Sequence, residues 1–452
     1  MTGEDNTPSG HDISSEFLDT SITRRRLLQG GIASAGALAL SGLLGAGTDA
    51  LASVRGATSV GRTIKLGYVS PETGPLAPFG QADKFVIANL QKVLADGIVI
   101  KGTRYPFEVI VEDSQSTDAR AAQVASDLIN NSHIDLMLVS STPDVTNPVA
   151  DQCEANSIPC ISTVAPWQSW FFGRGATPKT VYKWTYHFFW GLEDLEAVYY
   201  SIWLKVPNNK VIGALWPNDP DGLAFAAKAT GFPAFVDPKG YTVINPGQYP
   251  DGDDQFTSQI SDFISHNAEI LTGVPQPPDF ITFYQQAAQQ GYKPKVATIA
   301  KAMLFPSSAY ALGSLAQNIS SEVWWGPTHP YQSSLTGQSA GTLAGLYETQ
   351  TNNQWTQPIG FVHALFEVAF AAYKKAGTVD SKEALVGALS KLALNTIVGP
   401  LNWATGPVPN VTKTPLVGGQ WRKGSKYPYE LVIVTNTEHP NIPTAGTPEA
   451  IQ

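Results

Sequence analysis

The stretch that decides the fold runs from Asp135 to Gln152 and reads DLMLVSSTPDVTNPVADQ. Its apolar run, residues 136–139, predicts a buried strand. Three hydroxyl residues follow, 140–142, and Pro143 then predicts the first turn of a helix, where a missing N–H costs nothing. The stretch is therefore a strand-to-helix junction that presents hydroxyl groups at the carboxyl end of a buried strand.

The same alternation continues on both sides of this junction. Apolar, strand-like runs alternate with segments that have helical spacing and end at Gly or Asn. The predicted strands are 63–70, 105–113, 134–141 and 158–163, and the predicted helices are 80–97, 118–131 and 143–156. Strands alternating with helices predict an α/β fold with a doubly wound parallel sheet, in which a ligand lies beyond the carboxyl ends of the strands.

A second alternating set follows an aromatic-rich segment, residues 181–203, and covers residues 210–302. Two strong helical segments, 340–353 and 360–377, come after it, so the second lobe interrupts the first. The predicted organisation is a first lobe over 62–185, a second lobe over 186–327, a return to the first lobe over 328–396, and a return to the second lobe with a C-terminal tail over 397–452.

The N-terminal segment 1–52 is predicted to be an export signal rather than part of the fold. Thr23, Arg24 and Arg25 resemble the start of a twin-arginine motif, a weakly apolar stretch covers residues 30–47, and Ala50-Leu51-Ala52 offers a small-residue cleavage site. The alternative is an anchor that stays in the membrane. We expect an exported protein of the periplasm or the extracellular space.

The chain has only two cysteines, Cys153 and Cys160. In an exported protein this short spacing predicts a disulfide, and the alternative is two buried free thiols. No second pair completes a zinc site, and the seven histidines show no HExxH or other metal-ligand spacing. We expect no metal and no cofactor.

Composition excludes several classes of protein. The chain is 43% hydrophobic and 15% charged with a formal net charge of -9, which indicates a large core and gives nucleic acid no basic surface to bind. No GxxxxGK[ST] loop is present, so the chain is not expected to bind ATP in a P-loop.

Five segments together carry a family resemblance. They are IKLGYVSPETGPLAPFGQ, VEDSQSTDARAAQVASDLI, LMLVSSTPDVTNPVADQCEANSIPCIST, WPNDPDG and GYKPKVATIAKA. In this order and spacing, over residues 62–440, the chain resembles the substrate-binding proteins of ABC importers of the branched-chain amino-acid (Leu/Ile/Val-binding) type. The resemblance implies a type I periplasmic binding protein fold, with two lobes joined by a three-crossover hinge. It also implies a non-enzymatic monomer that delivers a small solute to an ABC permease served by separate ATPase subunits.

The predicted ligand-binding residues lie at the ends of the first-lobe strands and at the crossovers. Thr142 is expected to cap the helix that starts at Pro143, and the free N–H groups there are expected to attract a carboxylate. The resemblance carries this carboxylate role to Ser141 and Thr142. The remaining candidates on matching positions or near the first crossover are Ser140, Ser162, Thr163, Ala165, Trp167, Phe79 and Trp190.

One departure from the family concerns the charged end of the ligand. Amino-acid binders of the family use an acid in the second lobe for the ammonium group, but the loop TIAKA places Lys301 there, with Asp219 and Asp221 as possible substitute acids. If Lys301 faces the cleft, an anion or an uncharged polar group is favoured. The expected ligand is a branched-chain amino acid or a related carboxylate or amide, and the alternative is an aromatic acid.

Two other function classes remain alternatives. A solute-sensing module would use the same fold. A secreted hydrolase would use Ser339, since residues 337–341 match GxSxG, but the segment before it is polar where that motif needs an apolar strand.

Overall fold

The computed structural model describes residues 59–452, and the predicted export signal lies outside them. A six-stranded sheet forms the first lobe, and all of its strand pairs are parallel. In sheet order the strands are β16 (Val411–Thr412), β8 (Thr185–Phe188), β7 (Cys160–Thr163), β6 (Leu136–Ser140), β2 (Ile64–Ser70) and β5 (Phe107–Asp113). Because the strands are parallel, their carboxyl ends meet at one edge of the sheet.

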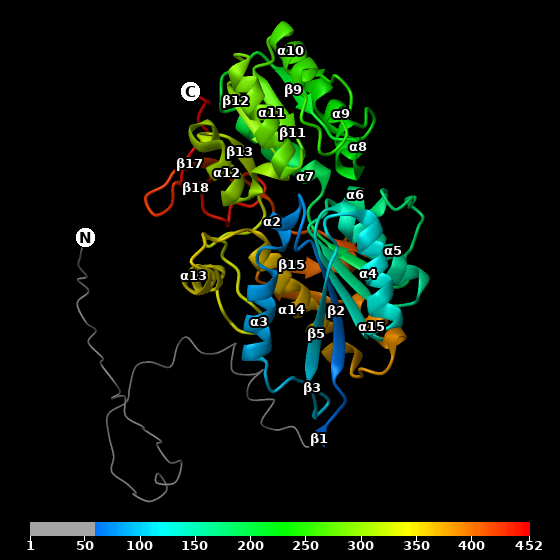
Figure 1. The fold of residues 1–452 in the computed structure, drawn as a ribbon. Helices are drawn as coiled ribbons and strands as arrows, with labels where there is room; N and C mark the ends of the chain where they lie inside the picture. Colours follow the sequence, from blue (N-terminus) through cyan, green and yellow to red (C-terminus); the bar gives the residue numbers. More distant parts are fainter. Residues whose placement is uncertain (1–58) are drawn as a thin grey trace, which may run out of the picture. The chain divides into compact units, whose positions relative to one another are not determined.

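Helices cover both faces of the first sheet (Figure 1). α4 (Asp118–Asn130) and α5 (Pro143–Ala155) pack against each other, while α3 (Asp83–Val93) and α15 (Lys382–Leu389) pack against α14 (Pro358–Ala376). Thr117 caps α4 by accepting a hydrogen bond from the backbone of Arg120. The other short elements of this lobe are β1 (Ser59–Val60), α2 (Ala77–Gly80), β3 (Ile98–Ile100), β4 (Thr103–Tyr105), α6 (Trp167–Phe171), α13 (Ala340–Thr351), β14 (Ala393–Thr396), β15 (Gly399–Asn402) and η4 (Trp403–Thr405).

The second lobe contains a seven-stranded sheet whose last two strands run antiparallel. In sheet order the strands are β10 (Thr242–Ile244), β9 (Val211–Leu215), β11 (Ile270–Gly273), β12 (Val296–Ile299), β13 (Ser320–Val323), β17 (Val417–Lys423) and β18 (Tyr429–Thr435). The helices are α7 (Leu192–Trp203), α8 (Pro220–Ala226), α9 (Phe232–Val236), η1 (Asp237–Lys239), α10 (Thr257–Ser265), α11 (Pro277–Gln289), η2 (Ala302–Leu304), α12 (Pro306–Leu312) and η3 (Gly313–Ala316).

The chain passes between the two sheets three times, which confirms the predicted two-lobed α/β fold with a three-crossover hinge. The passages follow β8, β13 and β16. The structure shifts two of the predicted boundaries. β8 keeps residues 185–188 in the first lobe, and β16 pairs with β8, so the final return to the second lobe comes after Thr412 rather than at 397.

The predicted disulfide between Cys153 and Cys160 is wrong, because both cysteines are free thiols in the structure. Cys153 lies on α5 and Cys160 begins β7, and both side chains are fully buried in the core of the first lobe. Burial raises the pKa of the Cys153 thiol well above its usual value. A protonated, buried thiol packs as a small apolar side chain and is not a ready nucleophile.

Among the helices of residues 59–452, none combines the length and the apolar composition that crossing a membrane requires.

Candidate functional site

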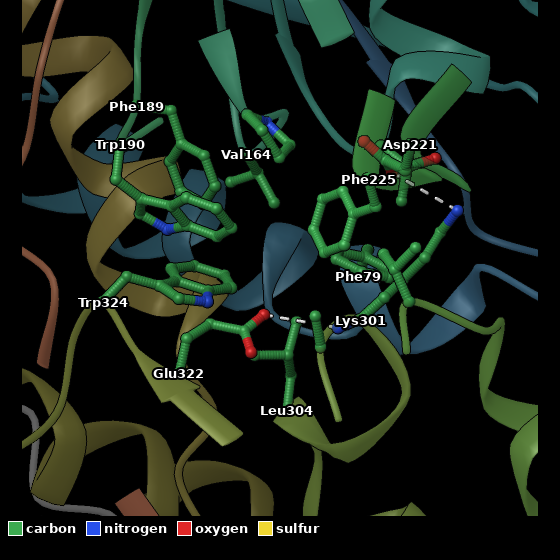
Figure 2. Close-up of a pocket in the computed structure, with 14 residues that line it drawn as sticks. Phe79, Val164, Phe189, Trp190, Asp221, Phe225, Lys301, Leu304, Glu322 and Trp324 are labelled. Carbon is green, nitrogen blue, oxygen red and sulfur yellow. Dashed lines mark hydrogen bonds and ion pairs between the residues drawn. The ribbon is translucent and has the colours of Figure 1, made fainter. Parts of the chain in front are cut away.

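A small cavity lies where the carboxyl ends of strands from both sheets meet (Figure 2). Its lining combines residues that follow β6, β7 and β8 in the first lobe with residues that follow β9, β11, β12 and β13 in the second. Open parallel sheets bind ligands at this edge. The lining residues are Phe79, Thr142, Val164, Pro166, Phe189, Trp190, Asp221, Phe225, Val274, Ala300, Lys301, Leu304, Glu322 and Trp324.

Five of the lining residues are aromatic: Phe79, Phe189, Trp190, Phe225 and Trp324. The centroid of Phe189 lies 4.7 Å from that of Trp190 and 5.4 Å from that of Trp324. Phe79 and Phe225 come from α2 and α8, and Figure 2 shows them across the cavity from the tryptophans. Trp190 and Trp324 follow β8 and β13, where the chain makes its first and second passages between the lobes, and both line the cavity.

Two lining residues have a backbone conformation that side chains disfavour. Val164 has φ 74° and Lys301 has φ 62°. A β-branched residue such as valine is strained at positive φ. Strained residues are common at ligand sites, because the surrounding structure stabilises the unfavourable conformation there. Both residues follow the ends of sheet strands, β7 and β12, so the strain lies at the two turns that shape the cavity.

Lys301 does not offer a free positive charge to the cavity. Its Nζ lies 2.5 Å from Asp219, 3.5 Å from Asp221 and 3.6 Å from Asp144, and its side chain is 3% exposed. Burial alone would lower the pKa of Lys301, but four nearby carboxylates (Asp219, Asp144, Asp221 and Asp251) outweigh burial and raise that pKa well above its usual value. The ammonium is therefore charged and paired with carboxylates of the protein.

Asp221 belongs to the same cluster and also faces the cavity. Burial raises the pKa of this carboxyl to about 7, against the opposing effect of the Lys301 ammonium. Its Oδ1 atom is buried and has no hydrogen-bond partner among residues 59–452. Asp221 is thus an acceptor that the protein leaves unsatisfied at the site.

Glu322 is the functional candidate that the sequence reasoning missed. It lies in β13, is 1% exposed and lines the cavity. The Tyr199 hydroxyl donates to its Oε2 at 2.7 Å, and the Lys301 backbone N–H donates to its Oε1 at 3.3 Å. Burial raises the pKa of Glu322, while the hydrogen bond from Tyr199 lowers it. The signal that could have identified Glu322 is an acidic residue within a buried strand, because acidic side chains are almost never fully buried unless they are paired.

The hydroxyl residues of the opening junction are only partly at the cavity. Thr142 lines it, whereas Ser140 and Ser141 are buried beside it, with hydroxyls that bond to no group among residues 59–452. The predicted cap is wrong: Thr142 makes no side-chain cap and instead donates to Asp144 Oδ2 at 3.1 Å. A carboxylate of the protein therefore already occupies the first turn of α5.

Four predicted residues, two at the end of β7 and two just after it, are not among those that line the cavity: Ser162, Thr163, Ala165 and Trp167. The Thr163 hydroxyl donates to the Phe188 carbonyl at 2.6 Å. Burial lowers the pKa of His187 to about 3, so this ring is neutral. Its Nε2–H donates to the Ala165 carbonyl, which leaves Nδ1 to accept from the Ser162 hydroxyl. Trp167 donates from Nε1 to Glu193 at 3.1 Å.

Ser339 serves as a helix cap. Its hydroxyl accepts a hydrogen bond from the Thr342 backbone at the start of α13. Its other hydrogen-bond partner among the described residues is the Thr342 hydroxyl. No base of residues 59–452 contacts it, so a hydrolase reading has no geometric support.

Solved structures of similar fold include substrate-binding and solute-binding proteins of transporters. A leucine-binding protein LivK from Thermotoga maritima is 16% identical, with a TM-score of 0.68, and the match covers 83% of this chain and 99% of that one. LivJ from Streptococcus pneumoniae, in complex with isoleucine, is 16% identical with a TM-score of 0.64, covering 82% and 99%. A solute-binding protein from Rhodopseudomonas palustris, in complex with 3,4-dihydroxy benzoic acid, is 15% identical with a TM-score of 0.65, covering 84% and 99%.

At these identities the similarity to solved structures establishes the fold alone, and no curated protein matches the chain. The sequence comparison is decisive for the family, because residues 63–425 match the family described as periplasmic binding protein. The chain belongs to the periplasmic binding protein family and has its type I fold.

Proposed function

We propose that this protein is the exported solute-binding component of an ABC importer, which passes a small solute to a membrane permease powered by separate ATPase subunits. The observation that carries the proposal is the cavity at the strand ends, whose wall includes Phe79 and Trp190 from the first lobe and Phe225 and Trp324 from the second. Small-molecule sites are typically apolar, aromatic cavities with a few placed polar groups.

The proposed mechanism is a shift of population between arrangements of the two lobes. A solute that contacts both lobes at once has more contacts when they are together, so its binding energy favours that arrangement. Branched-chain amino acids, related carboxylates or amides, and aromatic acids are the candidate solutes that the sequence and the solved relatives suggest. A sensor role would use the same site but a different partner.

The test is a thermal-shift screen of the purified protein against amino acids, aromatic acids, amides and amines. A solute that binds only the folded protein raises the melting temperature by mass action. We expect a small set of related solutes to raise it. If no solute of any class did so, the binding-protein proposal would be wrong.

A substitution then tests whether a solute that raises the melting temperature binds in this cavity. Replacing Trp190 with leucine removes an indole from the wall, and we expect binding to weaken by about tenfold or more, since buried aromatic anchors contribute most to binding. Trp355→Leu is the matched control because Trp355 lies outside this cavity, on the groove beside Tyr427. Calorimetric titration of both variants should show a loss only for Trp190→Leu.

A further inference from the structure

We infer that a surface shared by the two lobes, in which an apolar groove continues into an acidic groove, is the docking site for a basic segment of the membrane partner. The docked segment carries cationic side chains next to an apolar one. The inference rests on the proposed importer function, which supplies such a partner, and it adds the surface and the chemistry by which the partner is recognised.

The apolar groove lies where α6 of the first lobe packs against α8 of the second, and Figure 1 shows the two helices next to each other. Phe172, directly after α6, is 41% exposed, and Leu223, within α8, is 54% exposed. Among residues 59–452 no charged side chain lines this groove, whose lining is Gln168, Ser169, Phe172, Gly173, Leu192, Pro220, Leu223, Ala224 and Thr230. Exposed apolar side chains that gather in one groove are typical of interaction sites.

The acidic groove continues from the apolar one, because Gly173 and Pro220 line both. It also belongs to both lobes, since its wall includes the starts of α4 and α5 and residues of α8 and α11. Of the residues 59–452, no lysine, arginine or histidine lines it, but six aspartates do: Asp118, Asp144, Asp151, Asp219, Asp251 and Asp279.

The groove keeps negative charge after its own ion pairs are counted. Lys301 pairs with Asp144 and Asp219. Arg174 pairs with Asp151 at 2.7 Å. Three aspartates of the groove form no ion pair with any group of residues 59–452: Asp118, Asp251 and Asp279.

These carboxyls are ionised in mildly alkaline solution. Desolvation in the groove raises the pKa of Asp279 to about 6 and the pKa of Asp251 to about 7. Both carboxyls have therefore lost most of their protons at pH 8. Basic side chains complement a groove of this charge, and a partner of matching potential is selected over one of like charge.

Two buried acceptors in the acidic groove are left for a ligand. Asn147 is 7% exposed, and its Nδ2 donates to the Ser169 carbonyl at 3.0 Å, which fixes the orientation of the amide. Its Oδ1 atom is buried and accepts no hydrogen bond from residues 59–452. Asp279 is 2% exposed, and the Gly252 backbone N–H donates to its Oδ2 at 3.1 Å, so its charge has no cationic partner there. Because buried acceptors are normally satisfied, both atoms point to a donor supplied by the docked segment.

The surface favours a protein segment over a membrane. Anionic lipid headgroups would meet the aspartates, and the chain as a whole has a net charge of -9. Phe172 and Leu223 lie on different lobes, so the apolar groove is complete only while the lobes are together. A partner that binds this surface therefore distinguishes the arrangement that the solute favours from any other.

The experiment measures peptide binding to the purified full chain by fluorescence anisotropy at pH 8 and low salt. The probe is a short labelled peptide in which arginine, leucine and glycine repeat. One comparison peptide has glutamate in place of every arginine, and the other has serine in place of every leucine. We expect the arginine–leucine peptide to bind about tenfold more tightly than the first and about fivefold more tightly than the second. Vesicles of an anionic phospholipid should not bind.

Matched substitutions locate the peptide on the surface. Leu223→Ser should weaken binding by about fivefold, because it removes an apolar contact. Ile264→Ser should not, since Ile264 is similarly exposed, at 44%, but lies on α10 away from both grooves.

A second pair of substitutions tests the charge. Asp118→Asn should weaken binding by about threefold, the usual size for one exposed ion pair. Glu383→Gln should leave it unchanged. Both are exposed acids in the first turn of a helix, α4 and α15, and only Asp118 lines the acidic groove.

The solute provides the link to transport. A solute that raises the melting temperature should also tighten peptide binding, because the coupling between two sites is reciprocal. Equal binding of the three peptides, equal losses in Leu223→Ser and Ile264→Ser, preferred binding of the vesicles, or a peptide affinity that the solute leaves unchanged would overturn the inference and leave the importer proposal standing. Peptide binding as expected, with no solute of any class raising the melting temperature, would instead contradict the importer proposal and keep the docking surface.

Discussion

Lys301 shows how a single residue can mislead when its partners are unknown. In the sequence it is a lone cation in a ligand-contacting loop, yet Asp219 lies 2.5 Å away and Asp144 comes from the other lobe. Glu322 is the reverse case, an acid that looks like an ordinary strand residue and lines the cavity. At the scale of single residues, the charge that a ligand meets in a site is the net charge that remains once the residues of the site have paired with one another.

Asp83 gives a prediction about pH at the residue scale. This carboxyl is 1% exposed, accepts from the Ser70 hydroxyl at 2.6 Å, and burial raises its pKa to about 8. The folded protein therefore keeps a proton on Asp83 between about pH 4 and about pH 8, where the unfolded chain has lost it. Stability from this group is present at low pH and is lost as pH rises through that window.

Asp83→Asn removes this penalty. Relative to the wild type, we expect the variant to gain at least about 1 kcal/mol of unfolding free energy between pH 5 and pH 8, since one pKa unit corresponds to about 1.4 kcal/mol. Urea denaturation at the two pH values measures it. An equal effect at both would show that Asp83 is already ionised at pH 5.

The contact between α14 and the second crossover is the element-scale feature that fixes the cavity wall. A Cβ atom on Gly360 would lie 2.3 Å from the Trp325 indole, so only glycine lets α14 pass this close. Trp325 directly follows Trp324, which lines the cavity. The distance between α14 and the second crossover, and with it the position of Trp324, therefore depends on the absence of a side chain at Gly360.

Gly360→Ala tests this coupling. Alanine favours the helix by about 1 kcal/mol, but overpacking costs roughly 1–3 kcal/mol, so we expect a net loss of stability and weaker solute binding. Gly345→Ala in α13 is the control, because nothing lies within 4 Å of its Cβ; it should gain up to about 1 kcal/mol. Chemical denaturation of both variants gives the comparison, and a stabilised Gly360→Ala would show that Trp325 moves aside at no cost.

The ion-pair cluster around Lys301 links the two lobes at the scale of the whole molecule. Asp144 belongs to α5 of the first lobe, and Asp219 and Asp221 belong to the second. Removing one partner of a buried pair leaves uncompensated charge and typically costs about 3–5 kcal/mol.

Lys301→Met should therefore lower the unfolding free energy by about 3 kcal/mol or more. Asp144→Asn removes only the 3.6 Å interlobe pair and leaves Asp219 in place, so its loss should be about 1 kcal/mol or less. Urea denaturation at neutral pH measures both. Equal losses would mean that the interlobe pair, rather than the pairs within the second lobe, carries the stabilisation.

The sequence by itself determined the α/β alternation and the two lobes, and its resemblance to a known family implied the three crossovers between them. The alternation follows from the hydrophobic periodicity, because this periodicity shows locally which face of each helix or strand is buried. The crossovers follow from the order of the family motifs along the chain. The opening junction was rightly placed at a strand end, and Thr142 does line the cavity.

Only the tertiary structure decided the chemistry of the site. The pairing of Lys301 with carboxylates, the exposure of Glu322 to the cavity, the protein's own carboxylate at the start of α5 and the free state of the two cysteines all depend on contacts between distant elements. Ion pairing and desolvation act through space over a few ångströms. The net charge that a solute meets is therefore set by which side chains the fold brings together.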